Sequence, residues 1–319
     1  MTTRTLIVAQ NIAESYAEKI KKIVPDWNVI VGKDPSVWKN DFSDAEVIVG
    51  WKKAMEQHLS QTKSLKWIQT WSAGVNSLPL EDLSKKNVTI TSANGVHAYP
   101  ISETIFAFML GLTRKIHTYV QNQQEKKWHH GDLKLEIHGK TVGILGIGAI
   151  GKETAKIAKA FGMNVIGMRH SGKDADYVDQ MYKPEQLNEL LPQCDYVVVT
   201  LPLTDDTHRL IGKEQFQAMK NTAFFINIGR GDIVIEEELI DALQNEEILG
   251  AGLDVFEHEP LQETSPLWEM DNVIITPHTA GSTEHYEQRV IEDIFLPNLK
   301  SYVENSTPSI NVVDYKKGY

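Results

Sequence analysis

The sequence predicts an α/β protein made of two doubly wound parallel-sheet units with a cleft between them. Short apolar runs alternate with helical stretches through the first hundred residues, and a second such series begins near residue 140. Two longer helical stretches lie where the chain would pass from one series to the other. Alternating strands and helices are typical of parallel sheets whose faces are covered by helices.

The first unit is predicted from five strand-like runs, separated by helices such as Glu14 to Val24. The expected strands are Thr5–Ala9, Asn28–Val31, Val47–Gly50, Trp67–Thr70 and Val88–Thr91. From Ile101 to Val120 apolar residues recur at helical spacing, with Pro100 at a suitable first position. We expect this stretch to form one long helix that carries the chain into the second unit.

The second unit is predicted from six further runs, near residues 141–146, 164–168, 195–200, 223–227, 250–254 and 273–276. A helix from Glu284 to Val303 should return to the first unit, and Pro297 should bend or break it. The predicted domains are residues 1–98 with 284–319, and residues 99–283.

The length and composition of the chain argue against several classes of function. A chain of 319 residues is long enough for two separate cores. The 32 basic and 43 acidic residues give a net charge of −11, which argues against nucleic acid or an anionic membrane as the main partner. Cys194 is the only cysteine, so no intrachain disulfide can form. The apolar stretch Ile105 to Leu112 is too short to span a bilayer, and the N-terminus does not resemble a signal sequence, so we expect a cytoplasmic protein.

A glycine-rich turn lies between a predicted strand, Lys140 to Leu145, and a predicted helix that should end near Gly162. Its sequence is Gly146-Ile147-Gly148-Ala149-Ile150-Gly151. In a G-x-G-x-x-G turn the first glycine permits the tight turn, the second lets a pyrophosphate approach, and the third lets helix and strand pack closely. Free amides and the helix dipole then favour the phosphates. The pattern predicts a dinucleotide-binding Rossmann unit; the alternative is a purely structural turn.

The residues after the second strand of this unit bear on cofactor choice. An NAD site usually has Asp or Glu there, whereas this chain has Arg169, His170 and Ser171, and no acid before Asp174. Arg169 offers positive charge to a 2′-phosphate. We therefore expect NADP(H) to be preferred, with NAD(H) possible; the alternative is that Arg169 is an ordinary surface residue.

Arg230, Glu259 and His278 each follow a strand-like run, so all three should lie at one edge of a parallel sheet. The planar fork of an arginine can hold a carboxylate by two hydrogen bonds. A histidine can pass a proton to a carbonyl oxygen, and a carboxylate beside it orients the ring and favours its protonated form. These three side chains suit the reduction of a 2-oxo acid.

Together, these motifs make the chain resemble the D-isomer-specific 2-hydroxyacid dehydrogenases. That family includes glyoxylate/hydroxypyruvate reductases, D-phosphoglycerate dehydrogenase and D-lactate dehydrogenase. The resemblance covers essentially the whole chain and also rests on Leu201-Pro202-Leu203-Thr204 with Thr207, Gly252-Leu253-Asp254-Val255-Phe256, Glu259-Pro260 and Pro277-His278. Many family members have Asp where this chain has Arg169, which puts NAD as the cofactor in doubt and leaves the chemistry untouched.

The resemblance implies a fold, an activity and a set of site residues. It implies a flavodoxin-like substrate domain, a Rossmann domain, and NAD(P)-dependent reduction of a small 2-oxo acid to the D-2-hydroxy acid. Arg230 would bind the substrate, His278 would be the acid/base, and Glu259 would be its partner. Further cofactor contacts would be Leu201, Pro202, Thr207, Ile228, Gly229, Asp254 and Gly281. The substrate loop would be Ser72, Ala73 and Gly74.

In the family, the region corresponding to Gln121–Ile137 crosses to a partner subunit, so a homodimer is expected. His129 and His130 lie in this polar stretch, but adjacent loop histidines without clustered Cys or Asp are usually solvated, so no metal site is predicted. Two alternatives to the main prediction stay open. One is a non-enzymatic NAD(H)-sensing protein similar to transcriptional corepressors, and the other is a D-3-phosphoglycerate dehydrogenase.

Overall fold

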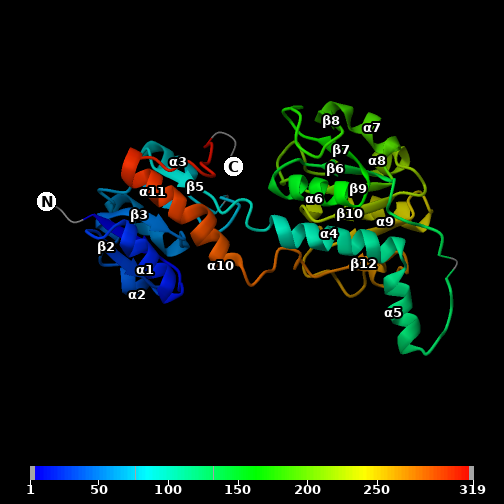
Figure 1. Cartoon of the computed structure of the whole chain (residues 1–319), viewed down its shortest axis with the longest axis horizontal. Coiled ribbons are helices and arrows are strands. Elements are labelled where there is room, and N and C mark those ends of the chain that lie inside the picture. The colour runs from blue at the N-terminus through cyan, green and yellow to red at the C-terminus, as the bar shows by residue number, and fades with distance from the viewer. Residues whose placement is uncertain (1–3, 76, 132, 316–319) are drawn as a thin grey trace. The chain divides into compact units, whose positions relative to one another are not determined.

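The computed structural model describes residues 4–75, 77–131 and 133–315. The chain divides into unit 1, Met1–Val96 with Thr283–Tyr319, and unit 2, His97–Ser282. The sequence predicted that the chain passes between the two domains after residues 98 and 283. Each unit contains one parallel sheet, so the predicted fold class of two parallel-sheet α/β domains is confirmed (Figure 1). Within the described ranges, no helix has the length and apolar character needed to cross a membrane.

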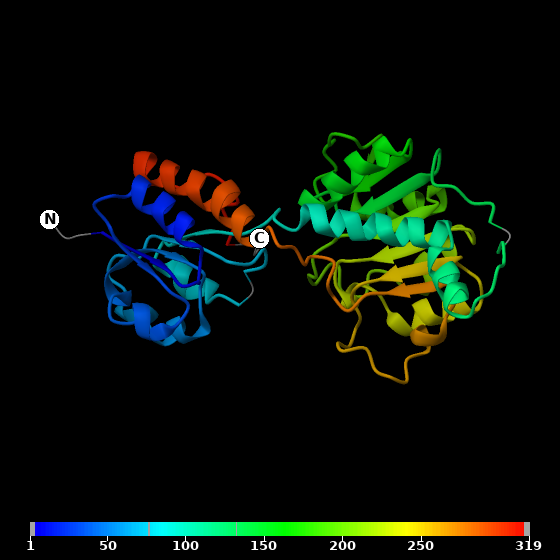
Figure 2. The same cartoon turned by 60° about the horizontal axis from the view of Figure 1, so that its bottom comes forward.

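Unit 1 has a five-stranded parallel sheet in the order β2-β1-β3-β4-β5. Its strands are β1 (Thr5–Val8), β2 (Asn28–Val31), β3 (Ala45–Val49), β4 (Trp67–Gln69) and β5 (Thr89–Thr91). Its helices are α1 (Glu14–Ile23), α2 (Pro35–Trp38), α3 (Leu80–Lys85), α10 (Tyr286–Gln288) and α11 (Leu296–Asn305), with 3₁₀ turns at Phe42–Asp44 and Lys53–Gln61. Alternate residues of β1 enter different cores: Ile7 packs on one face, and Leu6 and Val8 pack on the other. Helices α1 and α11 lie side by side over the second face (Figure 2).

The helix predicted from Glu284 to Val303 is helical from Tyr286 to Asn305, but its register changes along its length. A π-helical stretch, Arg289–Phe295, lies between α10 and α11. Pro297 is the second residue of α11. Proline lacks the N–H that the interior of an α-helix needs, so it is best tolerated in the first turn of a helix. Accordingly, α11 begins at Leu296, one residue before Pro297.

Unit 2 has a seven-stranded parallel sheet in the order β12-β11-β10-β9-β6-β7-β8. Its strands are β6 (Thr141–Leu145), β7 (Asn164–Met168), β8 (Gln180–Tyr182), β9 (Tyr196–Val199), β10 (Phe224–Asn227), β11 (Gly250–Leu253) and β12 (Val273–Ile275). Its helices are α4 (Ala98–Thr113), α5 (Ile116–Gln124), α6 (Ala149–Ala160), α7 (Leu187–Leu190), α8 (Lys213–Ala218) and α9 (Glu236–Gln244). Its 3₁₀ turns are Pro184–Gln186, Leu191–Gln193, Gly231–Ile233 and Pro266–Glu269. Strand β8 was not predicted, because its residues Gln180-Met181-Tyr182 lie in a polar stretch and only Tyr182 is buried, so no apolar run marks the strand.

The prediction of one long helix from Ile101 to Val120 is wrong. The helix breaks at Lys115, whose backbone is left-handed with φ +53°, and α4 and α5 lie on either side. The hydroxyl of Thr113 in the last turn of α4 is buried and hydrogen-bonded to the Tyr196 hydroxyl at 2.6 Å. Helix α5 has no buried residue and extends away from the sheet of unit 2 (Figure 1). The apolar spacing continues through the break, so periodicity could not reveal it.

A buried carboxylate ties the C-terminal helix of unit 1 to its sheet. Glu46 in β3 is 6% exposed and accepts two hydrogen bonds from the Arg4 guanidinium, at 2.7 and 2.8 Å. The Tyr302 hydroxyl of α11 donates a third at 2.7 Å. Although burial opposes ionisation, the hydrogen bonds from Arg4 and Tyr302 hold the pKa of Glu46 below its usual value.

We expect Glu46→Gln to lower the free energy of unfolding by about 2 kcal/mol at neutral pH, because hydrogen bonds to a charged group are lost. A carboxyl group whose pKa is lowered by folding stabilises the fold above its unfolded pKa, about 4.3, and this stabilisation is lost as the pH falls through the folded value. The difference between wild type and Glu46→Gln should therefore shrink below about pH 4. Urea unfolding at neutral and acidic pH measures both effects.

The matched control is Glu81→Gln in α3, because Glu81 is paired with Lys85 at 2.7 Å but is 84% exposed in its side chain. Exposed pairs contribute little, so Glu81→Gln should unfold like wild type. Equal unfolding midpoints for Glu46→Gln and Glu81→Gln would contradict the stabilising role of Glu46.

Candidate active site

The strands of unit 2 end in register, so the turns that follow them meet at one edge of the sheet. Leu145 at the end of β6 pairs with Met168 and Val199, and Asn227 at the end of β10 pairs with Val199 and Leu253. Parallel α/β sheets bind ligands beyond the carboxyl ends of their strands. The glycine turn, the Arg230 segment, and the segments with Glu259 and His278 all start from this edge.

The glycine turn has the geometry that a bound pyrophosphate needs. Gly146 has φ +112°, a conformation that favours glycine. Gly148 caps α6, and a Cβ built on it would meet no atom within 4 Å, so the space beside its backbone is open. A Cβ on Gly151 would lie 2.2 Å from the Gly146 carbonyl oxygen, so only glycine permits this packing. Among the described residues, no side chain caps the N-terminus of α6, where Ala149 and Ile150 begin the first turn. These residues fit the phosphates of a dinucleotide.

Arg169, directly after β7, is half-buried and held within its own loop. Its Nη2 donates to the Asp174 carbonyl oxygen at 2.9 Å. Its Nε is buried and has no hydrogen-bond partner among the described residues. His170 and Ser171, which follow, are exposed. A positive side chain and two exposed polar residues thus stand at the strand end where an acidic residue would exclude a 2′-phosphate.

Thr207 makes hydrogen bonds within the segment that follows β9. The Thr207 hydroxyl donates to the Pro202 carbonyl oxygen at 2.6 Å and accepts the N–H of Thr204 at 2.8 Å. The Leu201 carbonyl oxygen would lie 2.8 Å from a Cβ on Gly229, so the segments after β9 and β10 touch. Thr207 thus shapes the loop that contains Leu201 and Pro202.

The side chain of Asn227 shapes the turn that presents Arg230. Asn227 is buried; its Oδ1 accepts the N–H of Gly229, and its Nδ2 donates to the Arg230 carbonyl oxygen, both at 3.1 Å. The Arg230 guanidinium is exposed, and its Nη1 donates to the Gly229 carbonyl oxygen at 2.6 Å. The N–H of Ile228 pairs with Val199 and continues the ladder into the turn.

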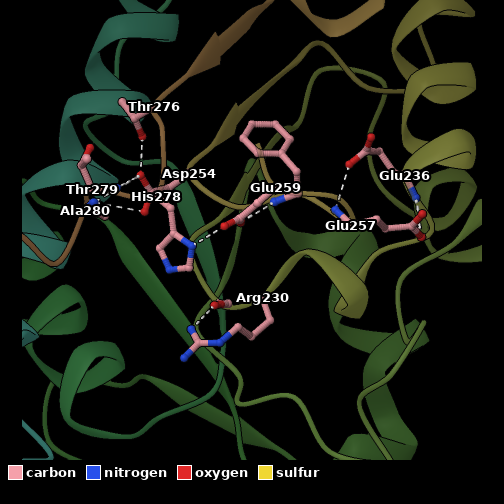
Figure 3. A network of polar contacts seen from close by, with 11 residues as sticks. Arg230, Glu236, Asp254, Glu257, Glu259, Thr276, His278, Thr279 and Ala280 are labelled. Atoms are coloured by element: carbon pink, nitrogen blue, oxygen red, sulfur yellow. Dashed lines mark hydrogen bonds and ion pairs between the residues drawn. The ribbon is translucent and has the colours of Figure 1, made fainter. Parts of the chain in front are cut away.

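Glu259 and His278 form a direct pair. His278 Nδ1 lies 2.7 Å from Glu259 Oε2, while Glu259 Oε1 accepts the Phe256 N–H at 3.1 Å. Burial favours the neutral form of Glu259, but the hydrogen bonds from His278 and Phe256 and the charge of Arg230 hold its pKa below the usual value. Figure 3 shows the imidazole of His278 and the guanidinium of Arg230 facing one another. A carboxylate, an imidazole and a guanidinium therefore meet at one place.

Asp254 at the end of β11 holds the loop that carries His278. Its buried carboxylate accepts the Thr276 hydroxyl at 2.6 Å and the N–H groups of Thr279 and Ala280 at 2.9 and 3.1 Å (Figure 3). The N–H of His278 donates to the Asp254 carbonyl oxygen at 2.9 Å, and His278 has φ +54°. A non-glycine residue in this conformation is held there by its surroundings.

Gly231 lets the arginine segment approach the glutamate segment. A Cβ on Gly231 would lie 1.9 Å from the carbonyl carbon and oxygen of Phe256, so any side chain would force the two backbones apart. Sequence reasoning assigned no role to Gly231, Asn227 or Thr276. The polar residue ending a buried strand was the available signal for Asn227, while the close approach at Gly231 is visible only in three dimensions.

The remaining predicted residues are Gly281, which is near the end of unit 2 in the sequence, and the loop Ser72 to Gly74 of unit 1. The Gly281 carbonyl oxygen lies 2.8 Å from His97 Nδ1, and both residues belong to unit 2. In unit 1, Ser72, Ala73 and Gly74 form an exposed loop in which the Ser72 hydroxyl donates to the Gly74 carbonyl oxygen at 2.7 Å. No His, Cys, Asp and Glu side chains in the described ranges cluster in a way that could hold a metal ion.

Comparisons with known proteins identify the family of the chain. The family model described as D-isomer specific 2-hydroxyacid dehydrogenase, NAD binding domain, matches residues 106–280. The chain is 34% identical over 249 residues to glyoxylate/hydroxypyruvate reductase B of Enterobacter sp. (strain 638), which is 76% of each chain. It is 32% identical over 276 residues to D-3-phosphoglycerate dehydrogenase of Methanocaldococcus jannaschii. That match covers 85% of this chain but only 52% of the relative, so the chain spans about half the length of that enzyme.

A solved structure gives the same result. The NADPH-dependent glyoxylate/hydroxypyruvate reductase of Sinorhizobium meliloti, in complex with NADP and sulfate, superposes with a TM-score of 0.77 at 28% identity, over 99% of this chain and 100% of that one. The family model covers the unit that contains the glycine turn, Arg230, Glu259 and His278. By sequence and by fold, the chain belongs to the D-isomer-specific 2-hydroxyacid dehydrogenases.

Proposed function

We propose that the protein reduces a small 2-oxo acid to the D-2-hydroxy acid, with NADPH as the preferred cofactor, in a reversible reaction. The observation that carries the proposal is the 2.7 Å contact between His278 and Glu259 beside Arg230. The relatives named glyoxylate/hydroxypyruvate reductase support this substrate class. The relative named D-3-phosphoglycerate dehydrogenase makes the phosphorylated substrate of that enzyme the second candidate.

Arg230 holds the substrate carboxylate. Its guanidinium is exposed and uses Nη1 for the Gly229 carbonyl oxygen, which fixes the orientation of the fork while other N–H groups remain for a carboxylate. By resemblance to the family, the backbone N–H groups of Ala73 and Gly74, in the loop that begins at Ser72, are proposed to bind the carboxylate as well. Held in this way, a 2-oxo acid presents its carbonyl oxygen to His278.

His278 donates the proton. Because Nδ1 faces Glu259, Nε2 is the nitrogen that reaches the substrate oxygen. Ionised Glu259 stabilises the protonated ring and fixes its plane. Bound nicotinamide cofactor supplies the hydride for the carbonyl carbon. The glycine turn and Leu201, Pro202, Thr207, Ile228, Gly229, Asp254 and Gly281 are the residues that would hold it.

The NADPH preference rests on Arg169 with His170 and Ser171. Arg169 already has one hydrogen bond, to Asp174, and its charge and remaining N–H groups suit a 2′-phosphate. The Sinorhizobium meliloti relative is described as NADPH-dependent, which supports the proposal.

A homodimer is proposed through α5 and the segment after it. Ile116 and Val120 are half-exposed, and Trp128 is 96% exposed, so this part of unit 2 offers apolar surface to a second copy. Sedimentation at micromolar concentration tests this proposal, and monomers alone would contradict it. A cytoplasmic location stays a prediction from the sequence.

His278→Ala should lower kcat for glyoxylate and hydroxypyruvate by about 10²–10⁴-fold with a smaller change in KM, because proton donation is lost. Glu259→Gln should also lower kcat, because the hydrogen bond from His278 Nδ1 to a charged carboxylate, which fixes the plane of the imidazole, is weakened. Steady-state kinetics at one neutral pH measure both.

The matched control is His138→Ala. His138 is an exposed histidine just before β6, at the opposite edge of the same sheet. Its replacement should leave kcat near the wild-type value. A His278→Ala protein with unchanged turnover would refute the proton-donor role.

Arg169→Ala should lower kcat/KM with NADPH by about 10–100-fold, the effect of losing a charged hydrogen bond, and change kcat/KM with NADH little. The control Lys173→Ala removes a positive charge from the same exposed loop and should retain the preference. Two results would contradict this role of Arg169. One is an equal loss of kcat/KM with NADPH and with NADH in Arg169→Ala, and the other is a wild-type protein whose kcat/KM is higher with NADH.

A further inference from the structure

Two glutamates outside the catalytic set bind each other's backbone. Glu236 is the first residue of α9, and Glu257 lies two residues before Glu259. The Glu236 N–H donates to the Glu257 carboxylate at 3.3 Å, and the Glu257 N–H donates to the Glu236 carboxylate at 3.1 Å (Figure 3). This reciprocal pair, Glu236–Glu257, joins the N-terminus of α9 to the segment that ends at Glu259.

The pair is electrostatically costly. Burial and the nearby charge of Glu257 raise the pKa of Glu236, against the effect of its hydrogen bond with the Glu257 backbone and the adjacent His258. Arg209 Nη1, 3.6 Å from the Glu257 carboxylate, offsets part of the repulsion. A buried carboxylate beside a like charge needs surrounding structure to keep it in place, and such arrangements concentrate near functional sites.

The pair acts on the same short segment that fixes Glu259. The Phe256 N–H donates to Glu259 Oε1, and the next N–H, that of Glu257, donates to Glu236. On another side Gly231 lies against the Phe256 carbonyl with no room for a Cβ. The backbone of residues 256–257 is therefore held between the arginine turn and α9, and the Phe256 N–H in this held segment sets where the Glu259 carboxylate lies.

We propose that Glu236 and Glu257 are positioning residues: their reciprocal hydrogen bonds hold the 256–259 segment so that Glu259 aligns His278 for proton donation. This inference rests on the proposed function for its kinetic consequence. In this role the two glutamates act through the position of Glu259 and not directly on substrate or cofactor. A misplacement of about 1 Å in such a group costs about 100-fold in rate.

Glu236→Ala and Glu257→Ala should each lower kcat by about tenfold to 100-fold, with KM for the 2-oxo acid and for NADPH within about twofold of wild type. Glu236→Gln should recover most of kcat, because its amide oxygen still accepts the Glu257 N–H. The control is Glu237→Ala. Glu237 is an exposed glutamate of the same first turn of α9, so its replacement removes a similar interaction with the helix dipole but leaves the Glu236–Glu257 pair intact. Wild-type kcat in Glu236→Ala would overturn the proposal.

A double-mutant cycle separates positioning from general destabilisation. If Glu236 acts through Glu259, then Glu236→Ala should have no further effect on kcat in a Glu259→Ala background. Additive losses would show that Glu236 supports the fold rather than the catalytic pair, and would overturn the proposal.

Hydrogen exchange of residues 254–260 gives a readout that does not depend on turnover. Exchange there should rise in Glu236→Ala and remain at the wild-type level in Glu237→Ala; equal exchange in all three proteins would overturn the proposal. If wild-type protein reduced no 2-oxo acid, the proposed function would fail, and this measurement would still decide whether the pair holds the segment.

Discussion

The parallel, in-register ends of the unit 2 strands are the constraint on which the site depends. Because β6, β9, β10, β11 and β12 end level with one another, the glycine turn, the arginine turn and the glutamate and histidine segments emerge at one edge of the sheet. Each contributes one group from a rigid strand end. Four segments far apart in the sequence thus reach one place without long loops.

Buried polar side chains then give each turn its shape. Asn227 binds both sides of the arginine turn, and Asp254 binds a hydroxyl and two N–H groups of the segment that carries His278. Such groups are costly to bury unless every partner is in place, so they specify one loop conformation. The backbone segments that present Arg230 and His278 are in this way fixed by side chains that face the interior.

Sequence patterns identified most of this arrangement because they report strand ends and local turns. The strands of both sheets other than β8, the glycine turn and the three polar residues all carry local signals. The break at Lys115 was missed because the apolar spacing continues through it. The roles of Gly231 and of the Glu236–Glu257 pair were missed because they arise from contacts between segments about 20 residues apart or more, and no periodicity records such contacts.

In the proposed reaction, Arg230, Glu259 and His278 direct hydride delivery to one face of the carbonyl group of a 2-oxo acid. Incubation of the protein with NADPH or NADH and hydroxypyruvate, pyruvate or 2-oxoisocaproate, followed by chiral chromatography of the products, tests this directly. We expect at least one of these acids to be converted to the D-2-hydroxy acid alone. The L-enantiomer, or tight cofactor binding with no turnover on the whole panel, would contradict it.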